Sequence, residues 1–436
     1  MNRSLCLIYL FIGIYFLKTL IKKNKKNKII GCYSGIACGI ILYYCIIPIV
    51  TIIFSNELSI QYVDIKSFII TKSAWSIMFS ALLTLIGFFV FNCAYNQINK
   101  NNDDEKIIYN SNKLVNISKI FAWGSLIIGS ICLFTFFGAF GGIRQALSYA
   151  EILRSFNSDL SDYISGVTAI LIIPARLVTV APIMFFLLIT EKRTKNRGIY
   201  KICFAISMVI AILYYMFNTG RAPLIYFLLC FAIILLYKIT NKPWKFVFLI
   251  AIISLPILDI LDNVSLYFQT GIWKELSINY FRYIYQFTYP FKNILNMVDI
   301  TEKYGCRFGV DFITSIISLL PGINFPASYE NTSIFYNGDN WRIFGGTPND
   351  LLTFAYIEFG ILGIPIICCV LGLLAGKLDK IIKIIPDGYI KKFIMSTMAI
   401  QFLTIVPNAD FISIIRGGFI LIVLIIVLTN SYSRRK

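Results

Sequence analysis

The sequence predicts an all-α integral membrane protein, and three observations support this fold class. Hydrophobic residues make up 58% of the 436 residues and charged residues only 14%, whereas soluble domains are roughly 45–50% apolar and about 25% charged. About eleven segments are apolar over the ~20 residues that a membrane-spanning helix needs. The basic residues lie in short clusters between these segments, the pattern that sets the orientation of membrane helices.

The predicted spans follow one another without an internal repeat. They cover approximately residues 4–21, 29–54, 73–97, 119–138, 165–190, 201–218, 222–239, 246–262, 351–376, 391–407 and 411–430. One long polar interval, 263–350, separates spans 8 and 9. We therefore expect a single polytopic domain over residues 1–436, with 263–350 as one large external (periplasmic) loop inserted in it.

The distribution of lysine and arginine predicts the orientation in the membrane. Lysine-rich clusters such as 18–28 and 377–392 fall on one side of alternating spans, which we expect to be cytoplasmic. The N-terminus then lies outside and the C-terminus inside. The first apolar run precedes its lysines and has no small-residue cleavage site, so we read it as a retained helix and not as a signal peptide.

Composition excludes several classes of function. A formal net charge of +18 would suggest nucleic acid in a soluble protein, but the clusters between apolar runs explain it, so we expect no nucleic-acid partner. Of the eleven cysteines only Cys306 lies in a polar loop, so no disulfide framework is indicated. The chain has no histidine and no CxxC motif, so we expect neither a metal site nor a cofactor.

The external side is rich in arginine, although topology does not require basic residues there. Its arginines are Arg3, Arg144, Arg154, Arg221, Arg282, Arg307, Arg342 and Arg416. Guanidinium groups bind oxyanions in a planar, bidentate geometry that lysine cannot offer. Ordinary ion pairs between loop side chains are the alternative, worth about 0–1 kcal/mol each when exposed.

Two arginines interrupt predicted spans. Arg176 lies between Pro174 and Pro182 on the order of 15 Å from the outer end of its span, and Arg416 interrupts the last span. A charge at such depth costs about 2.5–3.5 kcal/mol and usually faces a bundle interior or a watery cavity. The prolines indicate a broken helix at Arg176. The alternative is an arginine that reaches the interface or pairs with a neighbouring helix.

The turn between spans 6 and 7 predicts an anion site. Gly220 permits a tight reversal and Pro223 suits the first turn of the next helix. Arg221 stands at the start of that helix, where free amide donors add to its guanidinium.

The interval 263–350 is unusually aromatic for a polar loop. The stretch YFRYIYQFTYPF contains Arg282, and the part from Asn324 to Asp350 contains Glu330, Asp339 and Arg342. Aromatic faces suit a sugar chain, and they equally suit lipid headgroups. Apolar residues at helical spacing predict surface helices near 143–156 and 310–320.

The segment GGTPNDLLTFAYIEFGILGIPIICCVLGLLAGKLDK (Gly345 to Lys380) resembles the O-antigen polymerase (Wzy) family of oligosaccharide repeat-unit polymerases. The likeness lies in Gly-Gly-Thr, a polar turn, and Tyr-x-x-Phe-Gly-x-x-Gly leading into an apolar helix. The Gly220–Arg221 turn, the number of spans and the single large external loop are also similar to that family. One departure is Phe354, where the family often has an acidic residue.

The resemblance implies a GT-C-like glycosyltransferase, a multi-pass protein acting at the outer leaflet of the bacterial cytoplasmic (inner) membrane. It would transfer a glycan from undecaprenyl diphosphate to a sugar hydroxyl of another lipid-linked repeat unit, in contact with membrane lipid and a chain-length regulator. The departing diphosphate needs fixed cations, which we assign to Arg176, Arg221, Arg282, Arg342 and Arg416. The attacking hydroxyl needs a carboxylate base, for which Glu358 and Asp350 are preferred and Asp339 and Glu330 stay open.

Two other functions remain. An O-antigen ligase would join a finished glycan to lipid A-core, but such ligases typically have a histidine in the external loop. A flippase for lipid-linked oligosaccharides is a transporter, for which internal repeats and a site at mid-membrane are expected.

Overall fold

The structure is a computed structural model of the chain. It describes residues 2–27, 30–59, 65–100, 107–154, 170–191, 194, 196–218, 221–239, 260, 263–264, 266–267, 271–273, 280–317, 327–338, 347–411, 414 and 418–434. The regular secondary structure of this part of the chain is helical except for one pair of three-residue strands. The predicted all-α class is therefore confirmed.

Helices occupy every predicted span except 246–262, most of which lies outside the described residues. They are α1 (Asn2–Asn27), α2 (Cys32–Ile41), α3 (Ile47–Ile53), α5 (Ala74–Lys100), α6 (Ser111–Ala139), α9 (Ile172–Ala175), α10 (Val180–Thr190), α11 (Arg197–Asn218), α12 (Arg221–Ile239), α19 (Leu351–Phe359), α20 (Gly363–Lys383), α21 (Tyr389–Ile405) and α23 (Phe419–Asn430). Within the described ranges, seven helical segments are long and apolar enough to cross a membrane. The protein is thus a multi-pass membrane protein.

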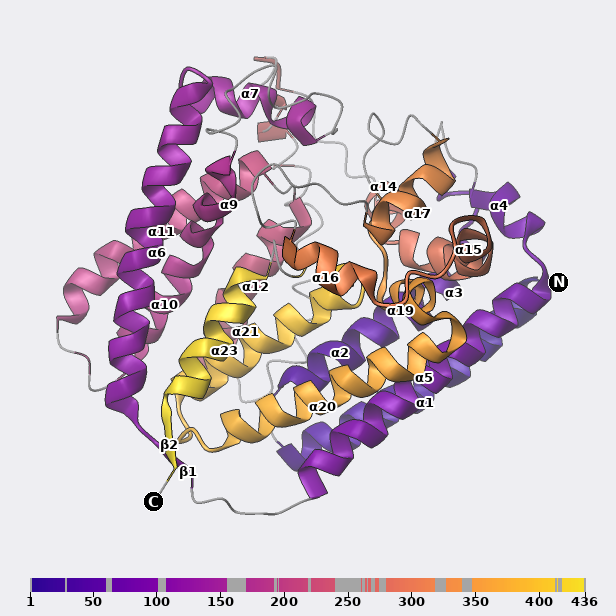
Figure 1. Cartoon of the computed structure of the whole chain (residues 1–436), viewed down its shortest axis with the longest axis horizontal. Helices are drawn as coiled ribbons and strands as arrows, with labels where there is room; N and C mark the ends of the chain where they lie inside the picture. The colour runs from indigo at the N-terminus through magenta and orange to yellow at the C-terminus, as the bar shows by residue number, and fades with distance from the viewer. Residues whose placement is uncertain are drawn as a thin grey trace.

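Shorter elements cap the two ends of the helical bundle. At one end lie α4 (Ile65–Thr71), α7 (Ile143–Arg154), α14 (Tyr280–Gln286), α15 (Tyr289–Tyr304), α16 (Val310–Ile317) and α17 (Ser328–Asn337) (Figure 1). We call this the loop end. At the other end, the strand end, β1 (Ile107–Tyr109) pairs antiparallel with β2 (Tyr432–Arg434). The surface helices expected near 143–156 and 310–320 correspond to α7 and α16.

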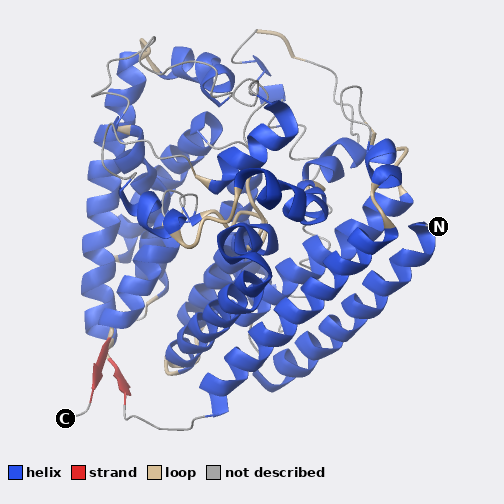
Figure 2. Cartoon of the chain, turned by 45° about the vertical axis from the view of Figure 1, so that its right-hand side comes forward, coloured by secondary structure: helices blue, strands red, loops and turns tan. Residues whose placement is uncertain are grey.

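The two chain termini lie at opposite ends of the molecule. The N-terminal helix starts at the loop end, and β2 places the C-terminal residues at the strand end (Figures 1 and 2). Lysines gather at the strand end, where Lys383 Nζ donates to Asn99 Oδ1 at 3.2 Å and joins the last turns of α20 and α5. Lys383 and the described helices of the polar interval 263–350 are therefore at opposite ends of the bundle.

Close helix packing depends on glycine. A methyl group built at Gly35 of α2 would lie 2.0 Å from the carbonyl oxygen of Ala399 on α21. One built at Gly372 of α20 would lie 2.5 Å from the Phe91 carbonyl oxygen of α5. In lipid, where apolar burial gives little drive for helix association, small residues let backbones approach and gain dispersion energy.

Three of the spanning segments are not regular α-helices. A π-helical turn at Leu42–Ile46 separates α2 from α3, and a 3₁₀ turn at Arg176–Thr179 separates α9 from α10. The break expected at Arg176 is thus confirmed. A second 3₁₀ turn, Gly360–Leu362, separates α19 from α20, so the span predicted as continuous over 351–376 changes direction near its loop end.

The described helices of the interval 263–350 pack onto the bundle. Phe291 and Met297 of α15 are fully buried and belong to the same apolar core as residues of the spans. The ring of Tyr9 on α1 meets that of Phe291 edge to face, with centroids 5.9 Å apart. Aromatic residues of this interval therefore fix the loop-end helices to the bundle.

Candidate functional site

Four buried carboxyl groups lie where the loop-end helices meet the bundle. They come from α16, from the segment 347–350, from α19 and from the connection that follows α21. We call Asp311, Asp350, Glu358 and Asp410 the carboxyl network; none is more than 2% exposed. Carboxylates are almost never fully buried unless they are hydrogen-bonded or paired, so each requires its own partners.

Asp350 is the N-cap of α19. Its Oδ1 accepts from the backbone N–H groups of Leu352 and Thr353, both at 3.2 Å, as an N-cap aspartate does. The Tyr44 hydroxyl donates to the same oxygen at 2.6 Å from the π-helical turn. Burial raises the pKa of Asp350 to about 6, so this carboxyl exchanges its proton near neutral pH.

Asp410 holds two loop-end segments together. Its Oδ2 accepts from the Asn349 backbone N–H at 2.8 Å, and its Oδ1 accepts from the Ser328 hydroxyl at 3.2 Å. The Ala409 N–H returns a bond to the Asn349 carbonyl at 2.8 Å. Burial raises the pKa of Asp410 to about 7. Asp410 is thus hydrogen-bonded to the backbone of Asn349, the residue directly before Asp350.

Asp311 and Glu358 form the second half of the network. Asp311 accepts from Arg307 Nε, four residues earlier in the connection before α16, and from the Ser328 backbone N–H at 2.8 Å. The Glu358 carboxyl accepts from the Gly309 N–H at 2.9 Å and contacts the Asp311 carboxyl. One guanidinium therefore stands beside two carboxyl groups. Glu358, which the sequence predicts as a base, is therefore buried in the protein interior.

Helix α16 shields this half of the network from its surroundings. Asp311 and Ser315 are buried on its inner face, whereas Ile313 and Ile316 are 64% and 57% exposed on the outer face. This arrangement is the reverse of a helix that faces water. It is the one expected where lipid covers the outer face and polar groups turn toward the protein interior.

The structure describes only part of the predicted arginine set. Arg176 is half-buried on the 3₁₀ turn and lies within electrostatic reach of Tyr215 on α11. Arg221 is the first residue of α12 and Arg282 lies on α14, but their side chains fall outside the described atoms. Arg342 and Arg416 lie outside the described residues. Whether these arginines share one basin stays a prediction.

Several residues of the site were not singled out from the sequence. Asp410 and Asp311 were not considered as candidates, nor were Tyr44 and Asn349. Tyr44 is separated from Asp350 by about 300 residues along the chain, so no local motif connects them. Arg307 and Asp311 are four residues apart, but Arg307 lies in the connection before α16 and Asp311 in its first turn, so helix periodicity does not predict their contact.

The carboxyl network is suited to proton exchange. Within the described part of the chain, no cluster of three or more Cys, Asp or Glu residues has a metal-binding arrangement. Two buried carboxyl groups with pKa values of about 6 and 7 are suited to accept or release a proton at neutral pH.

The fold and the site together define a helical, multi-pass membrane protein with a buried carboxyl network at its loop end. Comparison of the chain with protein-family models, with curated proteins and with solved structures gave no match.

Proposed function

We propose that the protein is a surface-polysaccharide polymerase, a glycosyltransferase that uses an undecaprenyl-diphosphate-linked glycan as donor. The observation that favours this most is the coincidence of two features at one place. Asp350, whose pKa of about 6 suits a general base, caps the helix that begins the polymerase-like motif. Transfer to a sugar hydroxyl needs such a base in a chain without histidine.

The proposed reaction is a single glycosyl transfer. The acceptor hydroxyl oxygen forms a bond to the anomeric carbon of the donor, and the bond from that carbon to the phosphate oxygen breaks. Undecaprenyl diphosphate leaves with the bonding electrons, and Asp350 takes the hydroxyl proton. Because Asp350 is fully buried, the acceptor must displace the residues that cover it. Glu358, bonded to the Gly309 N–H, fixes the connection between α15 and α16.

Arginines supply positive charge for the leaving diphosphate in this proposal. Arg176, Arg221, Arg282, Arg342 and Arg416 are assigned this role as a group, because a developing phosphate charge needs cations fixed in advance. Arg221, at the N-terminus of α12, combines a guanidinium with free amide donors.

A second function is favoured by a different feature of the same network. Ionisable groups buried in a helical membrane bundle are typical of proton-coupled transporters, and Asp350 and Asp410 both titrate near neutral pH. A flippase that moves lipid-linked oligosaccharides would use them as proton carriers and would leave the glycan unchanged. An O-antigen ligase is the third candidate function.

A strain without the gene separates the three functions, and the same strain carrying the intact chain is the control. Single repeat units on the surface lipid are the result expected for a polymerase. Lipid-linked units trapped inside the cell would indicate a flippase, and long lipid-linked chains never joined to their acceptor would indicate a ligase. In the complemented strain, Arg221→Ala should shorten the glycan ladder toward single units more than Arg221→Lys does, at equal protein level.

A further inference from the structure

Lys292 of α15 is a half-buried cation at the loop end. Its Nζ atom lies 5.8 Å from the ring centroid of Tyr285 and 5.5 Å from that of Tyr336. Among the described residues its ammonium group makes no ion pair and no hydrogen bond. Aromatic faces attract a cation, but they do not neutralise it.

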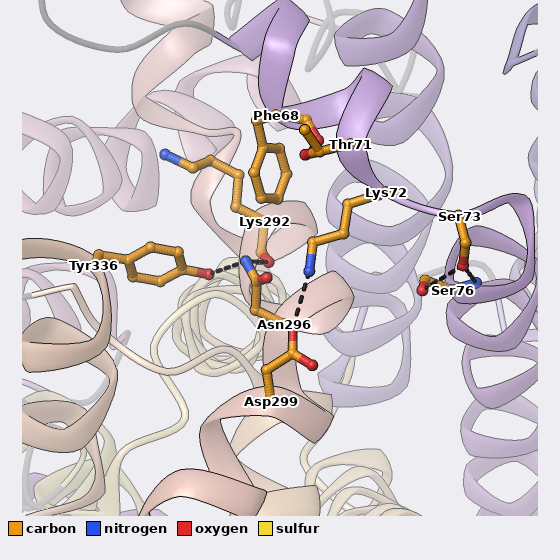
Figure 3. A network of polar contacts seen from close by, with 9 residues as sticks. All are labelled: Phe68, Thr71, Lys72, Ser73, Ser76, Lys292, Asn296, Asp299 and Tyr336. Carbon is orange, nitrogen blue, oxygen red and sulfur yellow. Dashed lines mark hydrogen bonds and ion pairs between the residues drawn. The ribbon is translucent and has the colours of Figure 1, made fainter.

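The nearest acidic residue on the same face of α15 is already neutralised. Asp299, two turns further along, accepts from Lys72 Nζ at 2.9 Å. Figure 3 shows that the Lys292 ammonium points away from this pair. The residues drawn in Figure 3 therefore include two cations, Lys72 and Lys292, and one carboxylate, Asp299.

The surroundings of Lys292 are fixed in place. Asn296 Nδ2 donates to the Lys292 carbonyl oxygen and to the Tyr336 hydroxyl, both at 3.0 Å (Figure 3). These bonds hold the Tyr336 ring of α17 against α15. Because the side chains around Lys292 are already ordered, less conformational entropy is lost when a ligand binds there.

The residues around Lys292 adjoin the carboxyl network. Asn293, the next residue after Lys292, donates through Nδ2 to the Pro348 carbonyl at 2.9 Å, two residues before Asp350. Tyr336 lies within electrostatic reach of Asp350. Lys292 and the proposed base thus belong to one connected set of helices at the loop end.

We propose that Lys292 binds a phosphate group of the polyprenyl-diphosphate-linked glycan. This inference rests on the proposed function, since it names the part of the donor that Lys292 binds. An ammonium group with three donors is a common point-charge partner of phosphate. Burial lowers the pKa of Lys292, and a bound phosphate would offset that effect by favouring the charged form.

The test is a titration of purified protein in neutral detergent with undecaprenyl phosphate, and separately with phosphatidylglycerol. We expect Lys292→Met to weaken undecaprenyl phosphate binding about tenfold, the scale of one charge-assisted contact. Lys292→Arg should bind within about threefold of the wild type. Phosphatidylglycerol should bind more weakly and without dependence on Lys292.

Lys303→Met is the matched control. Lys303 lies on the same helix beside the rings of Tyr304 and Phe335, but it is exposed. Its replacement should leave binding unchanged, and an equal loss there would overturn the assignment by showing a diffuse charge effect. If Lys292→Met does not purify as a monodisperse protein, Lys292→Gln takes its place in the same titration.

Two further results would overturn the inference. The first is undecaprenyl phosphate binding by Lys292→Met at wild-type affinity. The second is an equal, Lys292-dependent affinity for phosphatidylglycerol, which would mark a headgroup site for bulk lipid. Either would leave the polymerase proposal standing. That proposal fails separately, if the gene-deletion strain still makes long glycan.

Discussion

At the residue scale, Asp350 has two roles that its environment makes compatible. As an N-cap it satisfies two backbone donors of α19, which aspartate and asparagine do about equally well. As a proposed base it needs a carboxylate, which asparagine lacks. The two roles can therefore be separated by a single isosteric change.

Asp350→Asn should keep the fold and abolish the activity. The amide oxygen can still accept from α19 and from Tyr44, so we expect the thermal unfolding midpoint in detergent to stay within a few degrees of the wild type. Loss of the base should reduce polymer formation by about 10²–10⁴-fold, measured as the rate of glycan chain extension. Asp350→Ala, which also removes the cap, should lose about 1 kcal/mol of stability as well. Activity retained in Asp350→Asn would show that the residue is only a cap.

Stability should fall as the pH rises from about 4 to about 7. Asp350 and Asp410 have pKa values raised from 3.8 to about 6 and about 7, because burial disfavours the charged form. Their contribution is fully present below about pH 4 and is lost as the pH rises through 6 and 7, on the order of 1–4 kcal/mol. Thermal unfolding at several pH values measures this slope.

Asp410→Asn is the variant that checks the cause. The amide oxygen can accept from the Asn349 N–H while the amide nitrogen donates to the Ser328 hydroxyl, so the segment stays attached. We expect the pH slope to become shallower, mainly near pH 7. A slope equal to that of the wild type would assign the effect to other groups.

The site was predictable from the sequence only where chemistry and motif coincide. Asp350 precedes the Tyr-x-x-Phe-Gly motif and Glu358 lies within it, so the sequence indicates both as candidates, and the structure buries both carboxyl groups. Asp410 and Tyr44 were missed because their contacts to this segment join residues far apart in the chain. Burial, which sets the pKa values, is a property of tertiary packing and has no local signature.

At the scale of the helix, the glycines of the motif make the kink between α19 and α20. Gly360 has φ +61°, a conformation that strains residues with a Cβ atom. A methyl group at Gly363 would lie 1.8 Å from the Ala355 carbonyl oxygen. The spacing Phe-Gly-x-x-Gly is therefore explained by backbone geometry, independently of any catalytic role.

Gly360→Ala should destabilise the protein by about 1–2 kcal/mol through strain at positive φ. Gly124→Ala is the matched control, because it lies within α6 and a methyl group there meets nothing within 4 Å. That change should be neutral or stabilising by up to about 1 kcal/mol, owing to the higher helix propensity of alanine. Equal unfolding midpoints for the two variants in detergent would contradict the strain.

Helix positions were more predictable than helix regularity. The apolar runs located the described spans because lipid demands about 20 apolar residues. The prolines beside Arg176 correctly indicated a break, whereas the π-turn at Leu42–Ile46 and the kink at Gly360 were not expected. The kink depends on contacts with Ala355, and the π-turn accompanies the bond from Tyr44 to Asp350. Neither can be read from hydropathy.

At the scale of the whole molecule, the separation of lysine from the carboxyl network predicts orientation. The strand end should face the cytoplasm because lysine-rich connections are retained there. The loop end, with Lys292 and the carboxyl network, should face outward, where lipid-linked donors are presented. Since the chain termini lie at opposite ends, one experiment on them tests the whole arrangement.

Epitope tags on the two termini should differ in accessibility. In cells with a permeabilised outer membrane only, an impermeant protease should remove the tag before Met1 and spare the tag after Lys436. Lysis of the inner membrane should expose both. Cleavage of the C-terminal tag in unlysed cells, or protection of the N-terminal one, would reverse or break the predicted topology.

Reconstitution tests the central claim most directly. The purified chain is placed in liposomes with undecaprenyl-diphosphate-linked single repeat units on the accessible face, with Asp350→Asn as the matched inactive control. If the protein is a polymerase, we expect lipid-linked chains of two and more units, with one undecaprenyl diphosphate released for each bond formed. Repeat units that remain single, whether left in place or moved unchanged to the other leaflet, would contradict it.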